Sequence, residues 1–141
     1  MTVPDPDPAG WQPFDDPGFI TLVGPVLMRE EGGLPAFAFR AEPKHANLIG
    51  VVQGGMMMTF ADRALGICAM RAADGANCVT VQFEMQFVSA GRIGEMITMT
   101  PEVVRRTGSL VFMRGDARCG ARIVATATGV WKILRRRPDG A

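Results

Sequence analysis

The segment Gly54–Ala73, which reads GGMMMTFADRALGICAMRAA, decides the fold of this chain. It shows no alternation of polar and apolar residues and is rich in Ala, Met and Leu, which favour helices. It therefore predicts a helix of about 19 residues, ended by Asp74-Gly75, that is apolar on most of its faces. Such a helix has to be buried, so we expect other elements of the chain to wrap it.

Segments typical of strands flank this helix on both sides. The two before it are Phe19–Met28, interrupted near Gly24-Pro25, and Leu34–Ala41. The four after it are Cys78–Val88, Glu95–Arg106, Ser109–Arg118 and Ala121–Leu134. Because the last four are joined by short links, we expect them to form an antiparallel meander. The predicted fold class is α+β, with an antiparallel sheet of about six strands wrapped around one long central helix.

A chain of 141 residues is long enough for one domain with one core. Residues 1–17 contain prolines at positions 4, 6, 8, 13 and 17, with several Asp between them. This composition predicts an extended arm that is flexible unless Trp11 and Phe14 dock it. We therefore predict a proline-rich N-terminal arm over residues 1–17 and a single domain over residues 18–141.

Composition and charge argue against several classes of partner. The net charge is +1 and no basic stripe is interleaved with aromatic residues, so we expect no nucleic-acid partner. The N-terminus lacks the pattern of a secretory signal and no run of about 18 apolar residues occurs, so we expect no membrane partner. The three cysteines, Cys68, Cys78 and Cys119, form no CxxC pair, which favours reduced thiols in a cytoplasmic protein.

The side chains that could carry chemistry are few. His45 is the only histidine, which argues against a histidine-based metal site, and no phosphate-binding glycine loop occurs. We therefore expect no metal and no other cofactor. The chemistry has to come from carboxylates, amides, hydroxyls and the backbone.

Gln53-Gly54-Gly55, at the start of the predicted helix, is the first candidate feature. The first N–H groups of a helix have no partner within it, and the helix dipole adds positive potential there. These groups could stabilise a carbonyl oxygen that becomes an oxyanion, and glycine lets a ligand approach the backbone closely. The alternative is that the glycines only permit a tight turn from loop to helix.

Asp62, in the middle of the predicted helix, is the second candidate feature. Asp is a poor helix former and is costly to bury unpaired, yet the helical face that it shares with Gly55 and Met58 is apolar or small. Gly66, about one turn further on, would let another backbone or a ligand lie close to Asp62. The alternative is a surface Asp paired with Arg63 or another cation.

Gly54 and Asp62 are eight residues apart, which is roughly 12 Å along one helix. One carbonyl group cannot contact both residues of the same helix. If the two cooperate, the Asp must meet the Gly-Gly turn of a second subunit. A functional interpretation of both therefore predicts an isologous homodimer with facing helices and two equivalent sites.

The segment HANLIGVVQGG, from His45 to Gly55, followed by Asp62, resembles the PaaI-like hotdog-fold acyl-CoA thioesterases. That family shows an Asn, a Gly three residues later, a His-Gly-Gly turn and an Asp in the helix. The stretch Thr80–Glu95 and the hairpin at Arg106–Gly108 resemble later parts of the family. The resemblance covers residues 19–134 and implies a hotdog fold.

The resemblance also implies a role for each matching residue. Asp62 matches the general base or nucleophile, and Gly54 with Gly55 matches the backbone donor that polarises the carbonyl. Asn47 matches the side chain that orients the water or the Asp. Thr80 falls where the family has a small hydroxyl residue near the site.

Gln53 departs from the family pattern, in which His is commonest at this position. Gln cannot take up a proton, but its amide can still donate a hydrogen bond to the thioester carbonyl or to the leaving sulfur. His45 and Met58 are further candidates for substrate binding. The alternatives are a hydrogen-bonded loop histidine for the first and a packing residue for the second.

These inferences predict an enzyme that hydrolyses thioesters of the acyl-CoA type, with an aryl or medium-chain acyl group, at a dimer interface. Asp62 would drive attack by water, with CoA present only as part of the substrate. The assembly would be a homodimer or a dimer of dimers. Two alternatives stay open, which are a non-catalytic hotdog protein that binds acyl thioesters and a hotdog hydratase or dehydratase.

Overall fold

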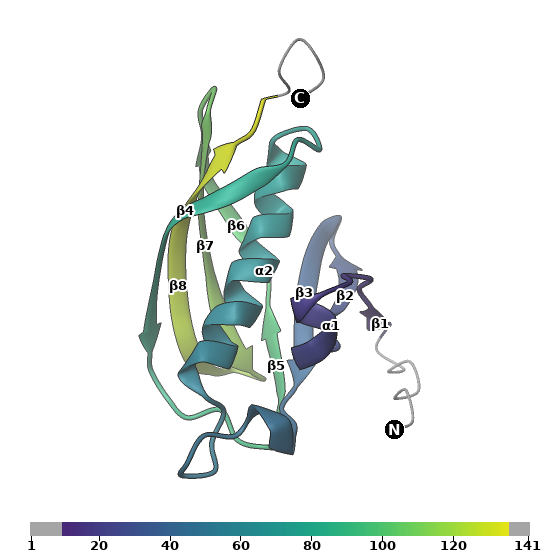
Figure 1. Cartoon of the computed structure of the whole chain (residues 1–141), viewed down its shortest axis with the longest axis vertical. Helices are drawn as coiled ribbons and strands as arrows, with labels where there is room; N and C mark the ends of the chain where they lie inside the picture. Colours follow the sequence, from purple (N-terminus) through teal and green to yellow (C-terminus); the bar gives the residue numbers. More distant parts are fainter. Residues whose placement is uncertain (1–9, 136–141) are drawn as a thin grey trace.

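The computed structural model describes residues 10–135. In chain order its elements are β1 (Gln12–Pro13), α1 (Phe19–Val23), β2 (Leu27–Glu31), β3 (Leu34–Arg40), the 3-10 helix η1 (Pro43–His45), α2 (Gly54–Ala72), β4 (Cys78–Phe87), β5 (Met96–Met99), β6 (Glu102–Arg106), β7 (Leu110–Cys119) and β8 (Arg122–Ile133). Figure 1 shows α2 lying lengthwise against the sheet, with β4 and β8 on one side and β3, β2 and α1 on the other. No helix among residues 10–135 is long and apolar enough to cross a membrane.

All strand pairs are antiparallel, in the order β1-β2-β3-β5-β7-β8-β4, and β6 pairs with β7 beside this path. The prediction of an antiparallel sheet wrapped around one long helix is confirmed. The helix supplies the centre of the core, because one side of it is fully enclosed by the sheet. The largest fully buried side chains are Met57, Phe60 and Leu65 of α2 and Phe37, Phe39, Ile97, Met99, Met113 and Trp131 of the sheet.

The predicted meander of the last four strands is wrong for β4. This strand pairs with β8 at the edge of the sheet, while β5 pairs with β3 and β7. The cause is the link over residues 88–95, which is a crossover rather than a hairpin. It passes beside the segment that leads into α2, where the Val52 N–H donates to the Gly91 carbonyl at 2.8 Å. A short link along the chain therefore does not make these two strands neighbours in the sheet.

Two predicted strands also differ from the observed elements. Residues 19–23 form the helix α1 instead of a strand, closed by a hydrogen bond of 2.7 Å from the Gly24 N–H to the Ile20 carbonyl. A short apolar run cannot be assigned to helix or strand by periodicity alone. The predicted strand Glu95–Arg106 is split into β5 and β6 at Pro101, whose missing N–H ends the ladder.

Residues 11–14 of the predicted N-terminal arm lie against the sheet. β1 pairs with β2, and the Phe14 N–H donates to the Val26 carbonyl at 2.8 Å. Trp11 is buried, and the Phe14 ring contacts the edge of the Phe37 ring with centroids 6.5 Å apart. Residues 1–9 of the predicted arm lie outside the described residues, and the boundary at residue 17 stays a prediction.

A bulge at Val81 sets the orientation of β4. Thr80 pairs with Trp131, but the next pair is Gln82 with Val130, so Val81 is an extra residue in the ladder. An extra residue exchanges the two faces of a strand from that point on. Before the bulge, Thr80 points to α2, and after it the residues that turn toward the helix are Phe83, Met85 and Phe87.

Without the bulge, the polar side chains Gln82, Glu84 and Gln86 would turn toward α2 in place of these apolar ones. The bulge therefore allows one strand to present a hydroxyl to the helix at one end and apolar side chains to it at the other.

Gly129 of β8 faces Phe83 directly after the bulge, and we expect its replacement to test this packing. A Cβ atom at Gly129 would lie 2.8 Å from the Gln82 carbonyl oxygen and 2.7 Å from the Trp131 ring. Gly129→Ala should lower the free energy of unfolding by about 1–3 kcal/mol, because backbone cannot give way easily. The exposed neighbour Thr128→Ala serves as control and should cost about 0.5 kcal/mol. Equal urea midpoints for the two variants would contradict the close packing at this bulge.

Candidate active site

Asp62 of α2 and Thr80 of β4 form a direct hydrogen bond. The Thr80 hydroxyl donates to the Asp62 Oδ1 atom at 2.7 Å, and the Asp62 side chain is partly exposed. Among residues 10–135, Thr80 is the one hydrogen-bond donor to this carboxylate. The contact depends on the bulge at Val81, which turns Thr80 to the helix. The arrangement fixes the direction of the carboxylate and leaves its other oxygen open to solvent.

The alternative partner for Asp62, Arg63, is engaged elsewhere. Its guanidinium forms an ion pair with Asp16 and lies 5.9 Å from the centre of the Phe14 ring. The prediction that Gly66 leaves room for another backbone or a ligand is wrong. A Cβ atom at Gly66 would lie 3.2 Å from the indole nitrogen of Trp131, so that side chain of the core fills the space.

The turn at Gln53-Gly54-Gly55 starts α2, with Gln53 as the N-cap residue. The Gln53 carbonyl accepts hydrogen bonds from the N–H groups of Met56 and Met57, at 3.0 and 3.1 Å. Within the described part of the chain, the N–H groups of Gly54 and Gly55 have no backbone acceptor. Two donors at the positive end of the helix dipole are therefore free to bind an anionic oxygen.

The two glycines have different surroundings. A Cβ atom at Gly54 would lie 3.2 Å from the Phe87 ring, whereas one at Gly55 would meet only the Gln53 side chain, at 3.5 Å. Gly54 is therefore packed by β4, and Gly55 is exposed. The turn lies about eight residues from Asp62 along α2, so the two features do not meet within one chain.

Asn47 shapes the loop that leads into this turn. Its side-chain oxygen accepts hydrogen bonds from the N–H groups of Ile49 and Val51, at 3.0 and 3.2 Å. The Gln53 N–H then donates to the His45 carbonyl at 2.8 Å. No hydrogen bond joins Asn47 to Asp62 within the chain, so the structure shows Asn47 as a residue that forms the loop.

His45 lies in the core rather than beside Asp62. The residue is 4% exposed, and its Nδ1 atom accepts from the Glu42 N–H at 2.9 Å. The Nε2 atom then carries the proton and donates to the Val23 carbonyl at 2.5 Å. Both ring nitrogens are thus bound to backbone. Met58, in contrast, lies on the same face of α2 as Asp62 and is 39% exposed.

A groove of about 290 Å³ lies beside Asp62, between α1 and α2. Its lining residues are Asp16, Phe19, Ile20, Thr59, Asp62 and Arg63. The sequence analysis missed the wall formed by α1, because it assigned Phe19–Val23 to a strand. The one available signal was the short apolar run itself, which fits a helix equally well.

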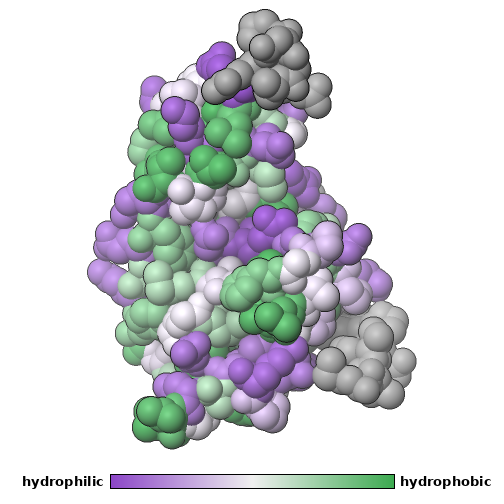
Figure 2. Space-filling view, in the orientation of Figure 1, coloured by the Kyte–Doolittle hydropathy of each residue, from purple (hydrophilic) through white to green (hydrophobic). Residues whose placement is uncertain are grey.

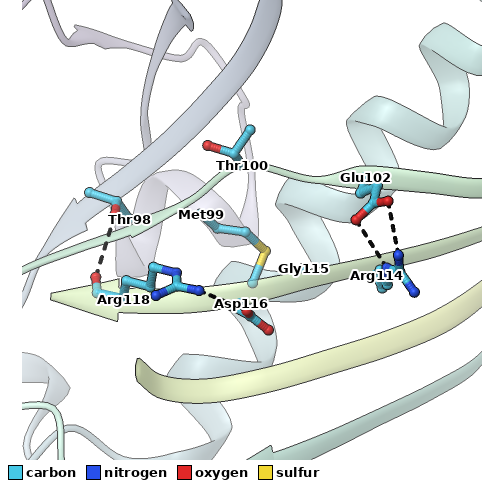
Figure 3. A pocket seen from close by; sticks show the side chains of 8 residues that line it. All are labelled: Thr98, Met99, Thr100, Glu102, Arg114, Gly115, Asp116 and Arg118. Carbon is cyan, nitrogen blue, oxygen red and sulfur yellow. Dashed lines mark hydrogen bonds and ion pairs between the residues drawn. The ribbon is translucent and has the colours of Figure 1, made fainter. Parts of the chain in front are cut away.

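A second hollow, of about 250 Å³, lies over β5, β6 and β7 (Figure 3). Arg114 makes two hydrogen bonds of 3.0 Å to Glu102, and Arg118 donates to Asp116 at 3.1 Å. None of the predicted site residues lines it, and its charged groups are paired with each other. Among residues 10–135, no group of three or more His, Cys, Asp or Glu side chains is placed to hold a metal ion. The groove at Asp62 is therefore the candidate site.

An ion pair between Glu95 and Arg122 supports the crossover beside the turn. The carboxylate oxygens of Glu95 accept from Arg122 at 2.6 and 2.5 Å, and Arg122 also donates to the Ala90 carbonyl at 2.6 Å. The hydrogen bonds from Arg122 and from the Arg92 N–H lower the pKa of Glu95 to about 2. Since the crossover binds the Val52 N–H, this pair supports the segment that leads into Gln53.

Comparison with known proteins identifies the family. Residues 49–126, more than half of the chain, match the family model of the thioesterase superfamily. The chain belongs to the thioesterase superfamily. PA0474 of Pseudomonas aeruginosa, which bears the name of an esterase, is 30% identical over 129 residues, covering 89% of this chain and 96% of that protein. Acyl-coenzyme A thioesterase 13 of Mus musculus is 29% identical over 104 residues, covering 73% of this chain and 74% of that protein.

The fold of this thioesterase agrees with solved structures. Zebrafish thioesterase superfamily member 2 superimposes with a TM-score of 0.77 at 26% identity, covering 85% of this chain and 89% of the zebrafish chain. The predicted hotdog fold and the assignment as a thioester hydrolase are confirmed, and the resemblance to hotdog thioesterases is confirmed at the level of the thioesterase superfamily.

We expect the thioesterase to lose the stabilising effect of Glu95 in acid. Because the pKa of Glu95 is lowered from 4.5 to about 2 in the folded state, its contribution is complete above pH 4.5 and is lost as the pH falls toward 2. Glu95→Gln should cost about 1 kcal/mol of unfolding free energy at neutral pH, and less at pH 3. Urea unfolding at both pH values measures this. Glu84→Gln, at an exposed carboxylate of β4, is the control. A cost for Glu95→Gln that does not change with pH would contradict the assignment.

Proposed function

We propose that this thioesterase hydrolyses acyl-CoA thioesters, with Asp62 directing a water molecule at the thioester carbonyl carbon. The observation that carries the proposal is the hydrogen bond from Thr80 to Asp62 at the edge of a groove. A carboxylate held on one oxygen keeps the other aimed in a fixed direction, as a general base requires. The name of the mouse relative, an acyl-coenzyme A thioesterase, supports this class of substrate.

In the proposed reaction, Asp62 takes a proton from water as the water oxygen attacks the carbonyl carbon. The carbonyl oxygen becomes an oxyanion, which the N–H groups of Gly54 and Gly55 stabilise. Collapse of the tetrahedral intermediate breaks the carbon–sulfur bond and releases the CoA thiolate and the carboxylic acid, and Asp62 gives its proton to solvent and becomes a carboxylate again. As the carbon–sulfur bond breaks, the side-chain amide of Gln53 donates a hydrogen bond to the leaving sulfur. The reaction proposed here uses no metal and no other cofactor.

The proposed site is shared between two copies of the chain. Gly54 and Asp62 are roughly 12 Å apart along α2, so the glycine turn that serves one Asp62 belongs to a partner. An edge of the sheet supports this arrangement, because within residues 10–135 β4 is the last strand and exposes apolar side chains. These are Val79, Val81 and Phe87, followed by Val88, all between 43% and 60% exposed. We propose an isologous homodimer with two equivalent sites, located in the cytoplasm.

One prediction for this mechanism concerns the carboxylate of Asp62. Asp62→Asn removes the base but keeps the shape of the side chain, and we expect kcat to fall by about 100-fold or more. Thr80→Ala frees the carboxylate and should lower kcat by about 10-fold, with Thr80→Ser restoring most of it. Thiol release from a panel of acyl-CoA substrates measures the rates.

Far-ultraviolet circular dichroism and the mass in solution show whether each of these variants keeps its fold and assembly. If wild type and Asp62→Asn hydrolyse a substrate at the same rate, the proposed base is wrong. If neither hydrolyses any substrate but both bind acyl-CoA, the protein is a binder of acyl thioesters.

Another prediction for this mechanism concerns the glycine turn and the shared site. Gly54→Pro removes one N–H donor at the first helical position, where Pro is tolerated, and Gln53 already has the extended backbone that a following Pro requires. We expect a loss of about 100-fold in kcat. Gly54→Ala is the matched control, because it places the same Cβ atom 3.2 Å from the Phe87 ring but keeps the N–H group, and its kcat should fall much less.

Co-refolding Gly54→Pro with Asp62→Asn then tests whether the site is shared. A mixed dimer carries one site with both defects and one site with neither, so a 1:1 mixture should regain about a quarter of wild-type activity. If each site lies within one chain, the mixture stays as inactive as its two parents.

A further inference from the structure

The helix α1 presents apolar side chains next to Asp62. Phe19 and Ile20 line the groove from one side, and Thr59 and Asp62 of α2 line it from the other. Phe19 and Leu22 are 62% and 73% exposed, so this short helix places two large apolar side chains on the surface beside the groove. Figure 2 shows this apolar patch over α1, bordered by polar residues.

The wall formed by α1 is held in place at both of its ends. At its start, Asp16 pairs with Arg63 of α2 and accepts through its carbonyl a hydrogen bond of 2.7 Å from the Thr21 hydroxyl. At its end, the Val23 carbonyl accepts from His45 and the Gly24 carbonyl accepts from Lys44, each at 2.5 Å. The groove is therefore bounded by fixed elements on both sides, as binding sites for small molecules usually are.

We propose that this groove binds the acyl group of the thioester, with Phe19 and Ile20 as its apolar wall. The proposal rests on the function proposed above, because it takes Asp62 as the group that directs water at the carbonyl carbon. The acyl chain and the CoA sulfur are both bonded to that carbon, so they must extend in different directions from the point beside Asp62 where the carbon lies. The groove that opens at Asp62 can receive one of them.

Charge and size favour the acyl group over CoA. The groove contains two carboxylates, Asp16 and Asp62, against one guanidinium, Arg63, which is already paired. The phosphates of CoA would be repelled there, whereas an uncharged chain would gain from contact with Phe19 and Ile20. The volume of about 290 Å³ is at the lower end for ligand pockets. It suits an aryl or a short to medium acyl group better than a long chain.

The test compares two exposed residues of α1, one inside the groove and one outside it. Phe19→Ala removes the larger of the two wall side chains, and Leu22→Ala is the matched control, because Leu22 is apolar, exposed and not part of the lining. For the full chain acting on phenylacetyl-CoA or hexanoyl-CoA, we expect Phe19→Ala to lower kcat/KM by about 10-fold, mainly through KM. The loss with acetyl-CoA should be far smaller. Leu22→Ala should have the kcat/KM of wild type on all three substrates, and Phe19→Leu should keep most of the wild-type value.

A binding measurement separates this proposal from the proposed function. The thioether S-hexyl-CoA cannot be hydrolysed, and calorimetry gives its Kd relative to that of CoA for each variant. We expect S-hexyl-CoA to bind wild type and Leu22→Ala more tightly than CoA does. The ratio of the two Kd values should be about 10-fold smaller for Phe19→Ala. If the hexyl group contributes equally in all variants, the acyl site lies elsewhere and the proposal is overturned. If the binding difference is found but no variant hydrolyses a substrate, the groove binds the acyl group and the catalytic proposal fails.

Discussion

The burial of α2 by the curled sheet is the constraint on which the rest of the structure depends. Each large apolar side chain enclosed by the sheet, such as Phe60 or Leu65, contributes about 1.5–3 kcal/mol. The sheet can enclose only one side of a helix, so the opposite face, with Gly55, Met58 and Asp62, remains partly exposed. A carboxylate in the middle of a largely buried helix thereby keeps contact with water and avoids the cost of burying an unpaired charge.

The bulge in β4 reconciles two demands on one strand. Packing against α2 requires Phe83 and its apolar neighbours to face the helix. The hydrogen bond to the Asp62 carboxylate requires Thr80 to face the helix as well. In a regular strand these residues have opposite parity and would lie on opposite faces. The extra residue at Val81 removes the conflict, and bulges are frequent beside functional sites because they re-aim side chains in this way.

Sequence reasoning succeeded where the signal was local and failed where it was not. The long Ala- and Met-rich run predicted the helix with its end displaced by only one residue, and the spacing of the resemblance placed Thr80 near Asp62. The pairing of β4 with β8 depends on contacts far apart in the chain, which no local pattern encodes. The break at Pro101 was visible in the sequence but was overlooked, whereas the helical state of Phe19–Val23 was ambiguous because the run is too short to show a period.

The presence of Gln53 where the family commonly has His is consistent with the chemistry of a thioester. A thiol has a pKa near 8.5, so a thiolate departs without first receiving a proton, unlike the alkoxide or amide anion of an ester or a peptide. A donor at this position only has to stabilise negative charge, and an amide N–H does so without titrating. The free N–H groups of Gly54 and Gly55 at the helix N-terminus provide the same kind of stabilisation for the oxyanion. In the proposed mechanism the turn therefore supplies fixed dipoles, and proton transfer is left to Asp62.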